Sequence, residues 1–440
     1  MKLTNYFGDD HAIIKALGIL TVLILGTLII TLETKTLILL IAGSAFVAFI
    51  LFSPVAGLCL LAFVGPFAGL MKIVPGVVTG NKLLGGLVAV SLFVHLALNR
   101  RNNFPTISII ILLYFLLVFL HLPILLWSSD PLDGLLSIGA RFSVIGLAFL
   151  VAFIIRNPAQ MKIFCGCATS GAALMGLYII VFGMESLAGE YGKRLAAGTN
   201  ENVLSHALAV GLLLSVFLLT EVSLARKALV LTLDFFILIA IGLTGSRGTW
   251  MALIIPLIII PLAHSRMRLR TRIVALTFSA ATIMAVAFGI SKNFFGYWGQ
   301  LVTERTSILT AESSGISTVS GGRMDYIWPV YLEEITKRPL FGSGFDARDY
   351  ILRASHNDIL NILAELGIIG FIVFAIFVWQ LFKQIGRCEN NSIRIPSLAL
   401  LWFLLVAGMT HNTIYLKSFS LAIGMICSLL AIYGKTPEPR

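Results

Sequence analysis

Residues 355–382 read SHNDILNILAELGIIGFIVFAIFVWQLF, a polar tetrapeptide followed by a long apolar run. The run from Ile359 to Phe382 is long enough to cross the hydrocarbon core of a bilayer as one helix. His356 lies at its polar end, where an imidazole meets water while the helix behind it lies in lipid. These residues predict a membrane helix with a titratable side chain at its amino-terminal end.

The composition places the whole chain in the same class. Hydrophobic residues make up 58% and charged residues 12% of its 440 residues, and the mean hydropathy is +0.96. A soluble domain does not tolerate these values, so we expect a polytopic membrane protein. The formal net charge of +11 does not indicate nucleic acid. Lys and Arg stand in short clusters between apolar runs, which is the pattern that sets membrane orientation, so no nucleic-acid partner is expected.

The five cysteines indicate neither a disulfide framework nor a metal site. Cys59, Cys165, Cys167 and Cys427 lie inside apolar runs, and no pair has the spacing of zinc ligands. We therefore expect no bound metal and no thiol chemistry.

The apolar runs predict an all-α transmembrane bundle of about 12–14 helices with a helical outer loop. Residues 1–290 would form transmembrane helices with short loops, residues 291–355 the outer loop, and residues 356–440 the last transmembrane helices. The runs within 36–71 and 228–263 are short, so neighbours there can merge. The first run is not followed by small residues, which predicts an uncleaved span. The expected spans are residues 12–31, 36–52, 55–71, 83–98, 107–127, 136–155, 163–184, 203–220, 228–243, 249–263, 273–290, 359–382, 397–409 and 418–433.

Basic residues orient this bundle. With the amino terminus inside the cell, every dense basic cluster, such as Arg100-Arg101 and the arginines of 266–272, falls on the inner side. The outer side then holds the turn 245–248, the long loop and the turn 410–413. The unusual polar residues therefore collect on one face.

Two arginines on that face stand in small-residue segments. Arg194 lies in GKRLAAGTN (192–200), where glycines let the backbone approach a ligand closely. From this segment alone, an ordinary juxtamembrane arginine bound to lipid phosphate is the better supported interpretation. Arg247 occupies the turn 245–248 between two apolar runs, where orientation does not favour a positive charge. A ligand or a snorkelling side chain would each explain it.

Two further arginines have a defined place in a predicted helix. Arg141 lies about one turn inside the span 136–155, where a charge needs a polar cavity or a partner. An ion pair with Asp130 or Asp133 is at least as well supported as substrate contact. Arg323 begins an amphipathic helix over the outer face, and it can aim inward or face solvent. The apolar residues that predict this helix are Met324, Ile327, Trp328, Tyr331 and Ile335.

His356 by itself is more often a hydrogen-bonded structural residue than a base. The helix behind it runs inward, however, so its amino-terminal dipole favours an anion and disfavours imidazolium. A neutral histidine is what a general base requires. Helices that start near Asn202 and Thr249 have the same direction, so three positive helix ends would meet with Arg194 and Arg247. Such a pocket suits a diphosphate.

The last outer turn would add His411 and Lys417 to this pocket, although His411 can simply cap or pack. A polyprenyl-diphosphate-linked glycan presents an anionic linkage at the membrane interface. Its sugar–phosphate bond is already activated, so transfer needs arginines for the departing diphosphate and a base for the incoming hydroxyl. The sequence contains no Asp-x-Asp pair for a metal-bound nucleotide sugar and no phosphate loop of the Walker type.

These residues resemble the bacterial O-antigen ligase and polymerase superfamily. The likeness is clearest over residues 192–415. His356-Asn357, followed by Gly367 and Gly370, matches the signature of the ligases. Supporting matches are RLAAGTN (194–200), Ser246-Arg247-Gly248, Gly322-Arg323 before an amphipathic helix, and PLFGSG (339–344).

The resemblance implies a metal-independent glycosyltransferase without a cofactor, multi-pass in the bacterial inner membrane, with its active site and outer loop facing the periplasm. For the matching positions it implies that His356 activates the acceptor hydroxyl and that Arg247, Arg323 and Arg194 bind the diphosphate. Arg141 matches a basic position in a corresponding helix. Asn357, His411 and Lys417 are expected to complete the substrate-binding set.

The acceptor separates the candidate functions. Protein-directed members carry a further soluble carboxy-terminal region that this sequence does not contain, so a ligase with lipid A core oligosaccharide as acceptor leads. A polymerase would use the same undecaprenyl diphosphate donor. A flippase for lipid-linked oligosaccharide is the distant alternative, since transport gives no reason for a histidine beside arginines on one face.

Overall fold

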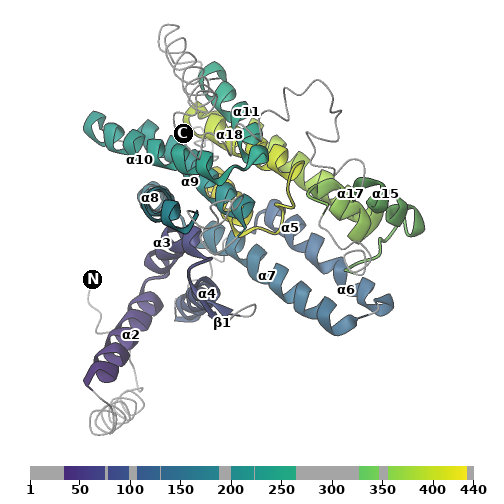
Figure 1. The fold of residues 1–440 in the computed structure, drawn as a ribbon, viewed down its shortest axis with the longest axis horizontal. Helices are drawn as coiled ribbons and strands as arrows, with labels where there is room; N and C mark the ends of the chain where they lie inside the picture. The colour runs from purple at the N-terminus through teal and green to yellow at the C-terminus, as the bar shows by residue number, and fades with distance from the viewer. Residues whose placement is uncertain are drawn as a thin grey trace, which may run out of the picture.

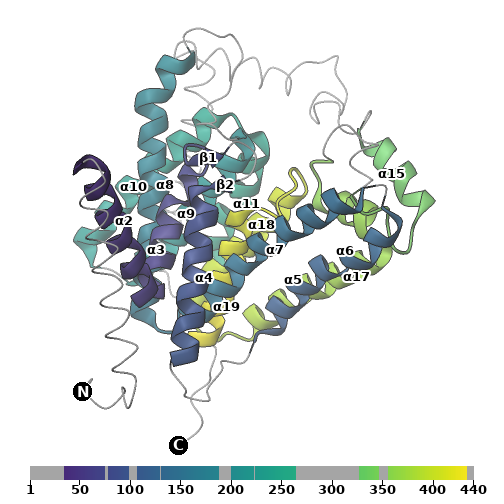
Figure 2. The ribbon, with the colours of Figure 1, turned by 90° about the horizontal axis from the view of Figure 1, so that it is seen from below.

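The computed structural model describes residues 34–74, 78–98, 107–128, 130–187, 200–221, 223–263, 327–345 and 355–433. These residues are helical apart from one short antiparallel strand pair, β1 (Lys72–Val74) with β2 (Val78–Thr79), and the connecting turns. Figures 1 and 2 show the helices arranged as a bundle. The predicted all-helical fold is confirmed.

The helices follow the apolar runs of the sequence. Their bounds are α2 (Thr34–Phe52), α3 (Pro54–Val64), α4 (Gly80–Leu98), α5 (Ile109–Phe119), α6 (His121–Ile124), α7 (Pro131–Ile154), α8 (Pro158–Leu187), α9 (Glu201–Glu221), α10 (Leu224–Thr244), α11 (Arg247–Ala263), α15 (Trp328–Lys337), α17 (Asp358–Gly386), α18 (Asn391–Gly408) and α19 (Lys417–Tyr433), with 3-10 turns at Gly65–Phe67 and Leu125–Trp127.

Within the described ranges, seven helices are long and apolar enough to cross a membrane, namely α4, α7, α8, α9, α10, α17 and α18. Ile109–Ile124 and α19 are apolar but shorter. The spans expected at residues 12–31 and 273–290 lie outside the described residues, so the predicted total of about 12–14 helices stays a prediction.

The short runs within 36–71 form a sharply bent pair. Gly43–Phe52 and Pro54–Phe67 meet at an angle of 116°. Ser53 caps the second helix by accepting a hydrogen bond from the Ala56 amide, and Pro54 begins it, where its missing N–H costs nothing. The runs within 228–263, in contrast, stay separate as α10 and α11.

Helices distant in sequence pack side by side. Helices α8, α9 and α10 contact one another, while α7 packs on α19, α11 on α18 and α5 on α17. Figures 1 and 2 show the α8–α10 group on one side of the molecule and α5 with α17 on the other. Small residues permit the closest approaches: a Cβ added to Gly171 of α8 would overlap the backbone of Phe63 in α3.

Helix α15 is amphipathic, as predicted. Tyr331 is 1% exposed and packs with Ile327 and Ile335 against Leu360 and Ala364 of α17, whereas Val330 and Leu332 on the other face are exposed. The helix therefore lies across the beginning of α17 (Figure 2).

Candidate functional site

Helix α17 is interrupted inside its apolar run. Gly367 has φ 64° and ψ −161°, which lies outside the helical region and is accessible chiefly to glycine. The first part of α17, from Asp358 to Leu366, is therefore a separate helical segment that directly follows His356.

The segment Pro339–Gly344 fills this interruption. Amides of Ser343 and Gly344 donate to the carbonyls of Ala364 (2.8 Å) and Glu365 (3.0 Å). In return, amides of Ile368 and Ile369 donate to the carbonyls of Pro339 (2.8 Å) and Leu340 (3.3 Å). Backbone groups that the broken helix leaves unpaired are thus satisfied by the neighbouring segment, as a membrane environment requires.

The glycines of residues 339–344 and Gly367 are required because the two segments pack backbone against backbone. A Cβ on Gly342 would overlap the Glu365 carbonyl, and a Cβ on Gly367 would overlap the Leu340 carbonyl. Gly344, with φ 65°, would meet Ile124 at 2.5 Å. Each motif therefore needs glycine because the other motif's backbone occupies the space of its side chain.

The Pro339–Gly344 segment is also tied to α15. The Glu334 carboxylate accepts hydrogen bonds from Ser343 Oγ (2.6 Å) and Lys337 Nζ (3.0 Å). Burial raises the pKa of Glu334, but these hydrogen bonds outweigh it and hold the pKa below its usual value. The carboxylate therefore stays ionised and keeps the segment against the helix.

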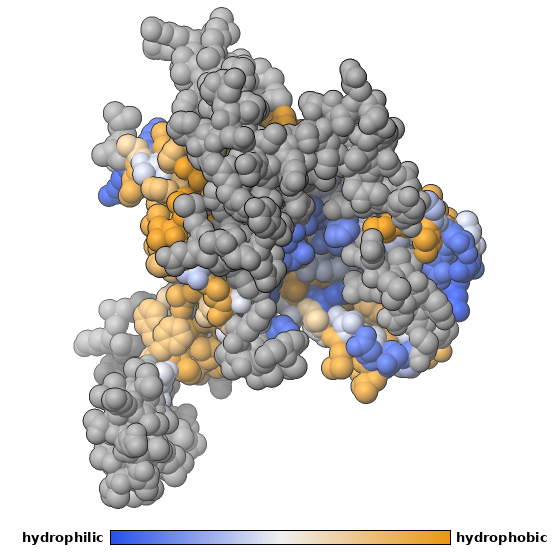
Figure 3. Space-filling view, viewed as in Figure 1, coloured by the Kyte–Doolittle hydropathy of each residue, from blue (hydrophilic) through white to orange (hydrophobic). Residues whose placement is uncertain are grey.

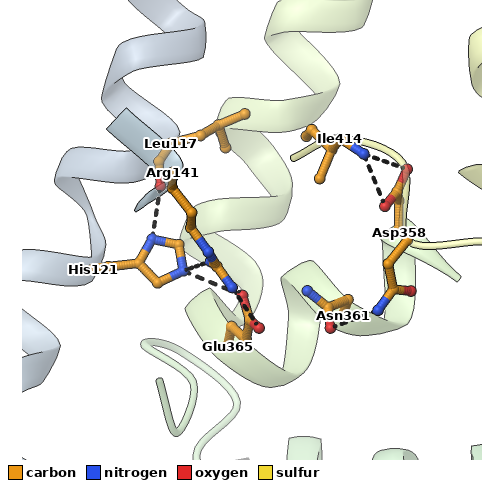
Figure 4. A network of polar contacts seen from close by, with 8 residues as sticks. Leu117, His121, Arg141, Asp358, Asn361, Glu365 and Ile414 are labelled. Carbon is orange, nitrogen blue, oxygen red and sulfur yellow. Dashed lines mark hydrogen bonds and ion pairs between the residues drawn. The ribbon is translucent and has the colours of Figure 1, made fainter. Parts of the chain in front are cut away.

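A buried ion pair lies directly beside the break. Arg141 Nη1 and Nη2 donate to Glu365 Oε2 (2.6 Å) and Oε1 (2.8 Å), and these residues are 4% and 1% exposed. The guanidinium carbon lies 4.0 Å from the ring centroid of Tyr415 and 4.5 Å from that of Phe345. Figure 4 shows the two side chains meeting between their helices. Arg141 thus has an ion-pair partner as the sequence suggests, but the partner is Glu365 rather than Asp130 or Asp133.

His121 completes this cluster, and its contacts define its tautomer. Arg141 Nη1 lies 2.5 Å from His121 Nε2, and a guanidinium can only donate. With Arg141 as the donor, Nε2 accepts and Nδ1 donates to the Leu117 carbonyl at 3.0 Å, which is the arrangement of a neutral imidazole. Glu365 Oε2 lies 3.3 Å from the same Nε2.

The first segment of α17 presents one polar face, with Asp358, Asn361 and Glu365 at helical spacing. Asp358 accepts hydrogen bonds from the amides of Thr413 (2.8 Å) and Ile414 (3.2 Å) and from the Thr413 hydroxyl (2.7 Å). Asn361 accepts from Asn412 Nδ2 at 3.4 Å. This face fixes the turn between α18 and α19 against α17 (Figure 4).

His356 precedes this segment in an unusual backbone conformation. Among the described residues, it is the only non-glycine residue with a positive φ, 53°. Such outliers persist where surrounding contacts enforce them, and they cluster at functional sites. Asn357 supplies those contacts: its Oδ1 accepts from the Ile359 (2.9 Å) and Leu360 (3.2 Å) amides, and its own amide donates to Asn412 Oδ1 at 2.9 Å. Asn357 is therefore the amino-terminal cap of α17.

His411 lies next to His356, with ring centroids 6.3 Å apart and the rings nearly perpendicular. Its Nε2 is 3.3 Å from Ser246 Oγ, and a Cβ on Gly248 would lie 2.7 Å from it. Arg247, between these two residues, is the first residue of α11, and its side chain is outside the described part. The first turns of α11 and α17 thus meet at the α18–α19 turn.

Lys417 is the first residue of α19 and is half-buried. The next residue, Ser418, has its hydroxyl 2.7 Å from His206 Nδ1 of α9. The starts of α9, α11, α17 and α19 therefore gather around residues 409–416. Figure 3 shows a hollow with hydrophilic residues on its floor where Figure 1 places this turn. Two expected site residues, Arg194 and Arg323, lie outside the described residues.

Sequence reasoning missed Glu365, His121, Asp358 and His206 as parts of this region. One signal was present, because Asp358 and Glu365 are carboxylates at the start of a transmembrane run, and such residues seldom lack a polar partner. Within the described residues, no group of three or more His, Cys, Asp or Glu is placed to hold a metal ion.

The chain has recognisable relatives. Residues 232–375 match the family model described as O-Antigen ligase. A Rickettsia felis protein named "Putative polysaccharide ligase" is 30% identical over 108 residues, which are 20% of this chain and 26% of that protein. A protein of the same name from Rickettsia bellii is 28% identical over 108 residues with the same coverage. This chain spans about a quarter of the length of the curated relatives that it matches.

The matched residues include the start of α11, the Pro339–Gly344 segment, His356 and the break at Gly367. They do not include Arg141, Arg194, His411 or Lys417. The described helices are those of a multi-pass membrane protein, and its residues 232–375 carry the match to the O-antigen ligase family model.

Proposed function

We propose that this protein is an O-antigen ligase that transfers glycan from undecaprenyl diphosphate to a hydroxyl of lipid A core oligosaccharide. The observation that carries the proposal is the placement of His356. This residue has a left-handed backbone conformation and precedes the amino-terminal end of α17. It lies beside His411, which contacts the first turn of α11, the helix that begins with Arg247.

The donor would be held by positive charge. The proposal gives the diphosphate to Arg247, Arg323 and Arg194, with Lys417 and His411 at the edge of the same site. Amino-terminal helix ends add N–H groups and a favourable dipole for an anion. Because guanidinium groups supply the charge that stabilises the leaving diphosphate, the reaction is proposed to proceed without a metal ion or cofactor.

The acceptor would be activated by His356. Its neutral imidazole accepts the proton of a core sugar hydroxyl while the hydroxyl oxygen bonds to the anomeric carbon of the glycan. The bond between that carbon and the phosphate oxygen breaks, and undecaprenyl diphosphate leaves with the electron pair. Asn357 contributes by capping the helix that follows the base.

The site is proposed to face the periplasm in the bacterial inner membrane. With the amino terminus inside, the starts of α9, α11, α17 and α19 would lie at the outer surface, where lipid-linked glycan and lipid A core are both reachable from the bilayer. Basic residues at the opposite helix ends support this orientation, among them Arg226 and Lys227 at the start of α10.

Lipopolysaccharide from a strain without this gene tests the acceptor. Loss of a ligase leaves bare core and polymer accumulated on undecaprenyl diphosphate, whereas loss of a polymerase leaves core with a single repeat unit. Transfer by the purified full-length protein, supplied with undecaprenyl-diphosphate-linked glycan and lipid A core without nucleotide or metal, tests the chemistry. A His356→Ala protein with the full transfer rate would refute the assignment of the base.

A further inference from the structure

The Arg141–Glu365 pair has no direct role in the reaction proposed above. Both side chains are almost fully buried, and both terminal nitrogens of Arg141 are engaged with Glu365 or His121. The rings of Tyr415 and Phe345 pack on the same guanidinium. This arrangement leaves Arg141 bound within the protein rather than presented to a diphosphate.

We propose that Arg141 and Glu365 are positioning residues, which together with the Pro339–Gly344 segment hold the first part of α17 so that His356 faces the acceptor hydroxyl. This inference rests on the proposed function, because it takes His356 to be the base.

The break at Gly367 explains why the ion pair can determine the position of the first segment of α17. In an unbroken helix, the amides of Ile368 and Ile369 would bond to the carbonyls of Ala364 and Glu365 and align the two parts. Here those four groups bond to residues 339–344 instead. The direction of the Asp358–Leu366 segment is therefore set by its lateral contacts and not by the rest of α17.

Glu365 contacts both the Pro339–Gly344 segment and α7. Its carbonyl accepts the Gly344 amide, its carboxylate binds Arg141 of α7, and a Cβ on Gly342 would overlap its backbone. The position of the segment relative to α7 thus depends on one bidentate ion pair, whose fork geometry fixes orientation as well as distance.

The other contacts of the segment bind a turn that is part of the same site. Asp358 and Asn361 hold residues 412–414, next to His411. They keep His356 and His411 together, and the carboxylate of Glu365 binds the same segment to Arg141 of α7, on which Tyr415 of the turn also packs. Loss of the ion pair would release the Asp358–Leu366 segment from α7 and so shift His356, which precedes it, relative to the first turn of α11.

A misplacement of about 1 Å at a reacting group costs on the order of 100-fold in rate. We therefore expect Glu365→Gln and Arg141→Lys each to lower kcat of glycan transfer by about 100-fold, while KM for the undecaprenyl-linked donor stays within about twofold. The double variant should be no worse than the worse single variant, because both changes remove one shared interaction.

Matched controls exist at the other end of the same helix. Arg387 and Glu389 are exposed just past the carboxy-terminal end of α17. The variants Arg387→Lys and Glu389→Gln make the same two chemical changes far from the site, so kcat should be unchanged. Membrane level and size-exclusion profile of each variant report whether it folds.

Hydrogen exchange gives a readout that does not depend on turnover. Glu365→Gln should raise exchange in residues 339–345 and 358–366 and leave residues 371–386 as in the wild type. Unchanged exchange in the first two segments would overturn the inference whatever the activity.

The kinetic outcomes separate this inference from the proposed function. A tenfold rise in donor KM with normal kcat in Arg141→Lys would make Arg141 a diphosphate ligand and refute the positioning role. Normal kinetics in both single variants would also refute it, and so would a double variant whose loss of kcat is the sum of the two single losses. A wild-type protein without glycan transfer would refute the proposed function, and a fully active His356→Ala would refute the assignment of the base. Either result would remove the proposed catalytic role of the pair.

Discussion

Gly342 and Glu365 approach each other so closely that no side chain fits between them: a Cβ on Gly342 would overlap the Glu365 carbonyl. The contact joins the Pro339–Gly344 segment to the broken helix α17. It makes the two glycine motifs of the sequence one structural unit, and His356 lies at the amino-terminal end of its helix.

Gly367→Ala is expected to destabilise the protein. Alanine strongly disfavours φ 64°, and its Cβ would overlap the Leu340 carbonyl, so a loss of about 1–3 kcal/mol is expected from backbone strain alone. Gly386→Ala, at the end of the same helix with open space around its Cα, is the matched control. Thermal unfolding in detergent measures both, and equal midpoints would contradict the account of the break.

His356→Gly should separate stability from activity. Glycine adopts φ 53° without steric cost, which relieves about 1 kcal/mol of strain, so the variant should unfold at or above the wild-type temperature. Its transfer rate should fall by roughly 100-fold to 10,000-fold, the usual contribution of a general base. His356→Asn, which tolerates the same conformation, should behave alike. A variant that is both less stable and fully active would contradict both statements.

Arg247→Ala should weaken donor use. Loss of one charge-assisted hydrogen bond costs about 1.5–3 kcal/mol, which corresponds to a rise in donor KM of roughly 10-fold to 150-fold. Arg226→Ala, an exposed arginine near the start of α10, serves as the control and should leave KM unchanged. The protein should stay at normal level in the membrane. Normal donor KM for Arg247→Ala, and for Arg323→Ala in the same assay, would leave the diphosphate site without support.

Asp358→Asn should loosen the turn that carries His411. The carboxylate accepts from the Thr413 amide and hydroxyl and from the Ile414 amide, and an amide group would place donors against donors. We expect a loss of about 1–3 kcal/mol in the free energy of unfolding, typical of a buried group left unsatisfied. Thr413→Ser keeps the hydroxyl and should cost clearly less. A reversed order in chemical denaturation would disprove this role.

The sequence was sufficient to predict the helices and to predict that the polar turns lie on one face. Apolar runs of membrane length predict α7, α8, α9 and α17, and the spacing of Tyr331 and Ile335 predicts the face by which α15 packs. The turn 245–248 and the turn 410–413 were placed on one side by the basic residues alone, and the structure brings them into contact.

The break in α17 and its partner could not be predicted in the same way. A single glycine in a long apolar run costs a helix only about 1 kcal/mol, so Gly367 did not stand out from Gly370. Arg141 and Glu365 are separated by 224 positions, and no spacing rule relates residues so far apart. The nearer carboxylates Asp130 and Asp133 were therefore the natural but wrong partners, since Asp130 instead caps α7.

The order of the chain has a consequence for biosynthesis. Residues 339–344 leave the ribosome before α17 does, so the groups that complete the interrupted helix exist before that helix enters the bilayer. In a circular permutant in which α17 is made first, these partners would be missing during insertion, and the amides of Ile368 and Ile369 could be satisfied only by the carbonyls of Ala364 and Glu365 in an unbroken helix. The order of synthesis thus favours the interrupted form of α17.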